Sequence, residues 1–202
     1  MNDRFINSLP IHARKRVLRL LHSEPVEVVL RKDRKTKWGD FRYYPEREAG
    51  LITLNQGLLP EAMLLTFLHE FAHFLTVLMF GNKVRPHGPE WKYTFQEVLS
   101  QFQKEEIWGN ELAKSIRKYS KNPKATVNTI PELYSQLVDI KSKEGVMLSQ
   151  LRFEDRFEFN ERTFVLLNKR RTRFLCQDIT NKREYLFRAA AIVKPIQKFD
   201  NE

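Results

Sequence analysis

The first third of the chain alternates between helical and strand-like patterns of hydrophobic residues. Apolar residues recur at helical spacing over residues 10–21, with basic residues between them, which predicts a short amphipathic helix. Three β-type runs follow at 26–30, 38–44 and 51–55. This order of elements predicts a small sheet that precedes the next helix, within an α+β fold.

The segment 60–81 is apolar almost all round, which predicts a buried helix. A proline followed by an acid suits its start, and a glycine suits its end. The strongly polar groups in its interior are His69, Glu70 and His73. A buried, unpaired charge costs several kcal/mol, so this cluster needs a compensating partner. A metal ion is the natural one.

The run His69-Glu70-Phe71-Ala72-His73 has the residue types and the spacing of a zinc hydrolase. Residues four apart share one face of a helix, so the two histidines can hold one metal ion. Glu70 then lies beside the open coordination position, where it can take a proton from a water of lowered pKa. The alternative is a pair of hydrogen-bonded core histidines, which the complete motif disfavours. We expect one Zn²⁺ per chain, with Glu70 as the catalytic residue.

A third ligand is expected after the motif helix. His87 follows His73 by fourteen positions and lies among glycines and prolines that can turn the chain back. Glu90 and Glu97 are alternatives, because some zincins complete the site with a glutamate from a following helix. We favour His87.

The second half of the chain changes from helical to strand-like patterns. A helix is expected from Pro89 through Phe102, and two more are expected over 107–119 and 130–140. Beyond residue 141, short β-type runs alternate with turn-like segments, which predicts a small antiparallel β unit or barrel. We expect two domains, 1–143 and 144–202.

Composition limits the class of protein. The chain has 202 residues, 42% of them hydrophobic, and can bury one sizeable core and a small second one. The single cysteine, Cys176, excludes an internal disulfide framework and a cysteine-based zinc site, and its strand-like context is typical of a small core residue. The N-terminus does not lead into an apolar signal-peptide core, and no uninterrupted membrane span is evident. We expect a soluble cytoplasmic protein without a membrane partner, with nucleoid association as an open option.

The chain is basic, with 35 Lys and Arg against 25 Asp and Glu. Two basic clusters, the first at 31–37 and the second at 169–173, have aromatic residues nearby, as nucleic-acid-binding surfaces often do. Basic runs are more often solvated loops, so the clusters alone are a weak signal. The candidate nucleic-acid-binding residues are Arg31, Lys32, Arg34, Lys35, Lys37, Lys169, Arg170, Arg171 and Arg173.

Several ordered segments together resemble the SprT-like metalloprotease domain, the family that includes Spartan. They are Trp38-Gly39-Asp40-Phe41-Arg42, Gly50 to Asn55, the HEFAH helix, and His87-Gly88-Pro89-Glu90-Trp91, within about residues 5–140. The resemblance implies a zincin-like core in which His69, His73 and His87 bind zinc and Glu70 is the catalytic base. It also implies cleavage of proteins that are attached to or bound on DNA. The chain lacks the paired cysteines of the zinc ribbon and the long tail found in some members.

Two hypotheses from different classes follow. The first is a zinc metalloendopeptidase that cleaves protein substrates, with DNA as a further partner. The alternative is a nucleic-acid-binding module whose zinc is structural. Glu70 favours the enzyme, because a structural site usually closes with four protein ligands and needs no adjacent base. A zinc hydrolase of a non-protein substrate has the same ligand set and stays open.

Overall fold

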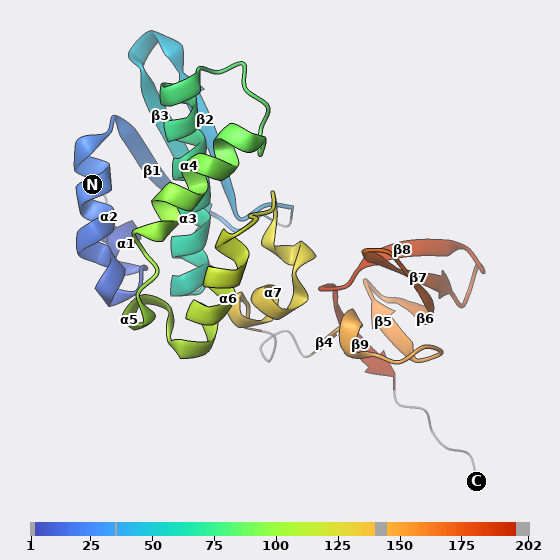
Figure 1. Cartoon of the computed structure of the whole chain (residues 1–202). Coiled ribbons are helices and arrows are strands. Elements are labelled where there is room, and N and C mark those ends of the chain that lie inside the picture. Colours follow the sequence, from blue (N-terminus) through green and yellow to red (C-terminus); the bar gives the residue numbers. More distant parts are fainter. Residues whose placement is uncertain (1–2, 35, 140–144, 197–202) are drawn as a thin grey trace. The chain divides into compact units, whose positions relative to one another are not determined.

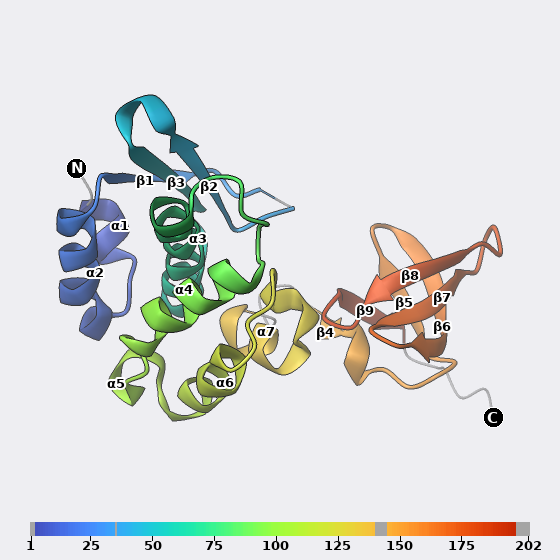
Figure 2. The ribbon, with the colours of Figure 1, turned by 45° about the horizontal axis from the view of Figure 1, so that its top comes forward.

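The computed structural model describes residues 3–34, 36–139 and 145–196. Contacts divide the chain into two units, 1–125 and 126–202, which Figures 1 and 2 show from two directions. This division comes earlier than the expected boundary at 143/144, which lies outside the described residues. Helix α7 (Pro131–Leu137) packs with the 3-10 turn η2 (Val127–Thr129) just before it, and both fall in the second unit.

The first unit combines a three-stranded sheet with helices, as the hydrophobic pattern predicts. The strand order is β1-β3-β2, with β1 parallel to β3 and β2 antiparallel to it. The strands are β1 (Val26–Arg31), β2 (Gly39–Tyr44) and β3 (Ala49–Asn55), with the 3-10 turn η1 (Pro45–Arg47) between the last two. The helices described in this unit are α1 (Asp3–Asn7), α2 (Ile11–Ser23), α3 (Pro60–Phe80), α4 (Pro89–Ser100), α5 (Glu105–Trp108) and α6 (Asn110–Ser120).

Helix α3 is the core of the first unit. It contacts β2 and β3 as well as α4, and it runs between them in Figures 1 and 2. Phe67, Phe71 and Phe74 of α3 are fully buried, as are Trp91 and Phe95 of α4. Because α3 buries most of its circumference, its few polar residues are fixed in a mainly apolar environment.

The apolar character of α3 is explained by its burial in the core of the first unit. By length and composition alone the helix could cross a membrane, with a mean hydropathy of 1.6 over its most apolar window. In the structure 61% of that window is buried inside the protein. The core helix of a folded domain meets the same criteria as a membrane span.

Three helix predictions are corrected at their ends. The helix expected over 107–119 is two helices, α5 and α6, separated by Gly109, whose φ of +73° suits glycine. Phe102 lies beyond the end of α4, where its carbonyl accepts a hydrogen bond from the Trp108 indole. The last helix ends at Leu137, and residue 140, its expected end, lies outside the described residues.

The second unit contains the expected antiparallel sheet, with strand order β4-β9-β5-β6-β7-β8. Every pairing between neighbouring strands is antiparallel. A register shift between Leu166 and Asn168 bends β6 against β7. The elements are β4 (Val146–Met147), η4 (Leu148–Gln150), β5 (Arg156–Phe159), β6 (Arg162–Arg170), β7 (Arg173–Asp178), β8 (Glu184–Arg188) and β9 (Ile192–Ile196).

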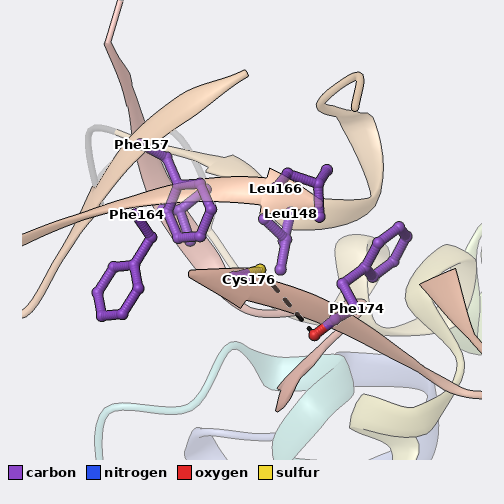
Figure 3. Packing of buried hydrophobic residues seen from close by; sticks show 7 residues of the cluster. Leu148, Phe157, Phe164, Leu166, Phe174 and Cys176 are labelled. Atoms are coloured by element: carbon purple, nitrogen blue, oxygen red, sulfur yellow. Dashed lines mark hydrogen bonds between the residues drawn. The ribbon is translucent and has the colours of Figure 1, made fainter. Parts of the chain in front are cut away.

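One face of this sheet forms a separate apolar core, which Figure 3 shows. Phe157 and Phe164 stack at 5.6 Å between ring centroids, and Phe187 meets both edge-on. Cys176 is fully buried in this cluster, its thiol 3.9 Å from the Phe174 carbonyl. Burial raises the pKa of the Cys176 thiol to about 12, so it stays protonated and acts as a core residue.

Candidate metal centre

His69 and His73 lie on the same face of α3, as their spacing predicts. Their ring centroids are 5.1 Å apart. Both side chains are partly buried, between the fully buried residues of the same helix. A rigid helix thus holds the first two imidazoles in a fixed geometry.

The third imidazole comes from a tight turn between α3 and α4. The Gly88 amide donates a hydrogen bond to the Arg85 carbonyl at 2.9 Å, which closes a turn with Pro86 and His87 at its centre. His87 has a φ of +58°, in the left-handed region. Gly88 has no room for a side chain, because a Cβ there would lie 2.8 Å from the Arg85 carbonyl oxygen. The turn therefore directs His87 back toward α3.

The three imidazoles converge on one point. The Nε2 atom of His87 lies 3.1 Å from that of His69 and 3.0 Å from that of His73. Zinc–nitrogen bonds of about 2.1 Å in a tetrahedral site put ligand nitrogens about 3.4 Å apart, so a shift of a few tenths of an ångström from the present spacing would accommodate such an ion. Glu90 and Glu97 are not part of this group, and Glu97 is exposed on α4. The structure thus brings His87, rather than either glutamate, to the histidine pair.

Burial keeps these imidazoles neutral, which is the form that binds a metal. It holds the pKa of His69 well below its usual value, and the neighbouring histidines add to the effect. Burial also lowers the pKa of His73 to about 4, with a further contribution from His87. The pKa of His87 is lowered by burial alone. Near pH 7 the site therefore offers three unprotonated nitrogens.

Glu70 is buried beside the histidines, with its side chain against the start of β2. Burial raises the pKa of its carboxyl to about 8; Asp40 adds to the rise, whereas Arg34 and Lys37 oppose it. A Cβ at Gly39 would lie 2.9 Å from the Glu70 Cγ atom and 2.6 Å from Thr66 Cγ2. Glycine is therefore required at position 39 for this close approach.

A hydrogen-bonded clamp fixes the loop that leads into Gly39. Arg34 donates to Asn55 Oδ1 at 2.9 Å, to Thr53 Oγ1 at 2.9 Å and to the Thr53 carbonyl at 3.1 Å. The Asn55 amide in turn donates to the carbonyls of Arg34 and Lys37, both at 3.0 Å. Sequence reasoning missed Asn55, and its one signal was a polar residue at the end of an apolar strand.

Trp91 is a second residue of the site that sequence reasoning treated only as core. Its indole lies 4.7 Å, 5.3 Å and 4.7 Å, centroid to centroid, from the rings of His69, His73 and His87. The ring is fully buried, and its Nε1 has no hydrogen-bond partner among the described residues. Its contribution is packing, which limits how far the three imidazoles can rotate.

The candidate nucleic-acid-binding residues of the first basic cluster differ in their surroundings. Arg31 and Lys32 are exposed, whereas the Arg34 guanidinium is engaged in the clamp and is half-buried. Lys37 forms an ion pair with Asp40 at 2.8 Å. Lys35 lies outside the described residues. Arg34 therefore supports the neighbourhood of Glu70 instead of presenting a free charge to solvent.

The candidates of the second basic cluster, in the other unit, are exposed around the β6–β7 hairpin. They are Lys169, Arg170, Arg171 and Arg173. The nearby aromatic residue Phe174 is buried and packs into the core of the second unit, so it is not available for base stacking.

Fold and site together define a chain with a three-histidine metal-binding group on a buried core helix and a carboxylate beside it. The chain belongs to the SprT-like family, which matches residues 6–114, more than half of its length. The matched region contains all three strands of the first sheet, α3 and His87. This family is associated with a metallopeptidase-like role.

The chain is also similar to Protein SprT of Vibrio atlanticus (strain LGP32). The two are 53% identical over 32 residues, which is 16% of this chain. The match spans about a fifth of that relative, 19% of its length. No solved structure matches the chain.

Proposed function

We propose that this chain is a zinc-dependent metalloendopeptidase with a zincin-like core. The observation that carries the proposal is the convergence of three neutral imidazoles beside a buried carboxylate. A structural zinc site usually closes with four protein ligands, whereas the metal-binding group found in the described residues has three histidines. The fourth position is then available for chemistry.

Zinc held by His69, His73 and His87 would supply Lewis-acid chemistry, by lowering the pKa of a water and polarising a carbonyl. Glu70 is the group that accepts the proton of the attacking water. Burial raises the pKa of this carboxyl in the metal-free protein, and a bound Zn²⁺ would lower it again toward the working pH, where a general base is most effective. The rigid α3 and the packed Trp91 keep the ligands oriented, and Gly39 lets β2 approach the carboxylate.

The substrates we propose are proteins, in particular proteins bound or crosslinked to DNA. The support for this class is the resemblance to the Spartan-type members of the family, together with the basic clusters at 31–37 and 169–173. We place the protein in the cytoplasm, at the nucleoid when it acts. The alternative is a nucleic-acid-binding module whose zinc only holds the fold.

Substitution Glu70→Gln separates the two hypotheses. The amide keeps the shape of the carboxylate but cannot accept a proton, so the variant should keep one zinc per chain and lose hydrolysis by about 10²- to 10⁴-fold. Zinc is measured by metal analysis, and hydrolysis on a DNA-crosslinked protein and on the same protein alone, with and without added DNA. Glu97→Gln, at an exposed position of α4, is the control and should behave as wild type.

Two results would contradict the enzyme. The first is a wild-type protein that holds zinc and cleaves neither substrate. The second is a metal-replete Glu70→Gln variant that hydrolyses at nearly the wild-type rate.

A further inference from the structure

Three arginines from three neighbouring strands form a row on the second unit. Arg170 of β6 lies opposite Arg173 of β7, and Arg173 lies opposite Arg188 of β8. Directly opposed residues point to the same face of a sheet, and all three of these are exposed. With strands about 4.8 Å apart, the row spans about 10 Å. We call these three residues the arginine row.

The arginine row brings three charges of the same sign close together. Like charges directly opposite each other destabilise a sheet. No ion pair to any of the three is found in the described part of the chain, whereas Arg162 of the same unit is paired with Asp178. Glu184 shares the face on β8 but lies four residues from Arg188, about 13 Å along the strand.

Tyr134 of α7 is electrostatically coupled to Arg188, at one end of the row. Burial raises the pKa of Tyr134, and the charge of Arg188 partly opposes that rise. A protonated phenol leaves the guanidinium charge of Arg188 uncompensated. The row therefore keeps a concentrated positive charge.

The opposite face of these strands carries the aromatic residues. Lys169 lies opposite Phe174, with its ammonium 5.9 Å from the centre of that ring. Phe174, Tyr185 and Phe187 pack into the apolar core of the unit. Lys169 thus lies over the core face, and none of the described residues of β6, β7 and β8 that share the face of the arginine row is aromatic. Leu186, 48% exposed, and the buried Leu175 opposite it are large apolar side chains beside the row on this face.

We propose that the arginine row binds the phosphate backbone of duplex DNA. Guanidinium groups bind phosphates through paired hydrogen bonds, and a duplex strand offers one phosphate per about 3.4 Å of axis, so a row of about 10 Å can meet two or three. Single-stranded binding relies on exposed aromatic rings for stacking; the three strands present none on this face, and Tyr134 near Arg188 is partly buried, so the duplex is favoured. The proposal rests on the DNA-associated substrates proposed above and assigns their recruitment to the second unit.

The arginine row differs from the basic cluster that is contiguous in the sequence at 169–173. Arg188, fifteen positions beyond Arg173, joins the row, whereas Lys169 lies on the other face. Arg173→Gln and Lys169→Gln therefore form a matched pair. Each removes one positive charge from the same hairpin, and only the first interrupts the row.

The test is fluorescence anisotropy of a labelled duplex of mixed sequence, titrated with the full chain across a salt series. We expect Arg173→Gln to weaken binding about ten-fold and to lower the slope of log affinity against log salt by about one, while Lys169→Gln stays close to wild type. The triple variant Arg170→Gln/Arg173→Gln/Arg188→Gln should lower the slope by two to three, at about 0.9 per phosphate contact. The corresponding triple lysine variant keeps the charge and should keep most of the slope.

Three outcomes would overturn the proposal. The first is equal effects of Arg173→Gln and Lys169→Gln, which would mean that only net charge matters. The second is unchanged binding by the triple glutamine variant, with its fold verified by circular dichroism. The third is tighter binding to single-stranded DNA, or to vesicles of phosphatidylserine and phosphatidylcholine, than to the duplex. Zinc content and cleavage of a DNA-free protein are measured in parallel and should be unchanged, so that a failure here leaves the peptidase proposal intact.

Discussion

His87 adopts a backbone conformation that few residues other than glycine take. Its φ of +58° carries strain of about 1–3 kcal/mol, and such strain tends to occur at functional sites. The surrounding turn holds it, with Pro86 before it and the hydrogen bond from Gly88 to Arg85 closing it. The strain is explained by the direction it gives the imidazole, toward His69 and His73.

We predict that His87→Asn loses most of its zinc, while its metal-free form is at least as stable as metal-free wild type. Asparagine tolerates the left-handed region better than most residues, but its amide cannot replace the imidazole as a ligand. His87→Val should also lose zinc and should be less stable by about 1 kcal/mol or more, because a β-branched residue is strained there. Metal analysis and urea unfolding of the metal-free proteins measure both effects. If either variant retains a full zinc complement, His87 is not the third ligand.

At the scale of elements, the strand β2 and the loop before it are held against α3 by the clamp of Arg34 and Asn55. Asn55 is 3% exposed and satisfies two carbonyls of the loop. The clamp therefore fixes Gly39 against Glu70, although neither clamp residue lies on α3. The site depends on this loop as well as on the motif helix.

We predict that Asn55→Ala retains zinc but lowers both the stability of the first unit and its rate of hydrolysis. Removing the amide leaves two loop carbonyls without a donor and removes one of the acceptors of the Arg34 guanidinium, which keeps its bonds to Thr53. Leaving a buried polar group unsatisfied costs about 1–3 kcal/mol. The proposed zinc ligands lie on α3 and on the turn before α4, so the metal should remain. Thermal unfolding, metal analysis and the separate values of kcat and KM are the measurements. The control is Gln56→Ala, next in the chain and exposed; full activity in Asn55→Ala would show that the clamp has no part in the site.

At the scale of the whole molecule, the buried titratable groups make the stability of the metal-free protein depend on pH in two opposite ways. The histidines have lowered pKa values, so below about pH 6.5 the unfolded chain binds more protons than the folded one and stability falls with acid. Glu70 has a raised pKa, so between about 4.5 and 8 the folded protein holds the extra proton. Its contribution to stability therefore falls as pH rises through that window.

We predict that the metal-free protein is most stable near pH 6.5. Below that value the loss of unfolding free energy from two or more histidines exceeds the gain from Glu70. Above it, among these groups only Glu70 changes its protonation, and the free energy of unfolding falls by about 1.4 kcal/mol per pH unit. The urea midpoint of the metal-free first-unit transition, measured from pH 4.5 to 8, should show this maximum. Glu70→Gln should remove the decline above pH 6.5; a wild-type midpoint that is flat from 6.5 to 8 would contradict the burial of an ionisable Glu70.

The sequence by itself determined the features that depend on local spacing. An i, i+4 pair lies on one face of any helix, so His69 and His73 could be placed together before the fold was known. An apolar circumference predicts a buried helix, and short β-type runs predict strands, which established the α+β class and the antiparallel second sheet. The element ends were less certain, since Gly109 and the turn after α4 depend on how neighbouring segments pack.

Only the tertiary structure decided which distant residues meet. It shows that His87, rather than Glu90 or Glu97, lies next to the histidine pair. It also shows that Gly39 lies against Glu70, and that Arg34 is hydrogen-bonded to Asn55 instead of being exposed with the rest of its basic cluster. It also aligned Arg170, Arg173 and Arg188 through the register of three strands, and turned Lys169 to the other face. The physical reason is that spacing along one element fixes the face on which a side chain lies, whereas convergence between elements is set by packing and strand register.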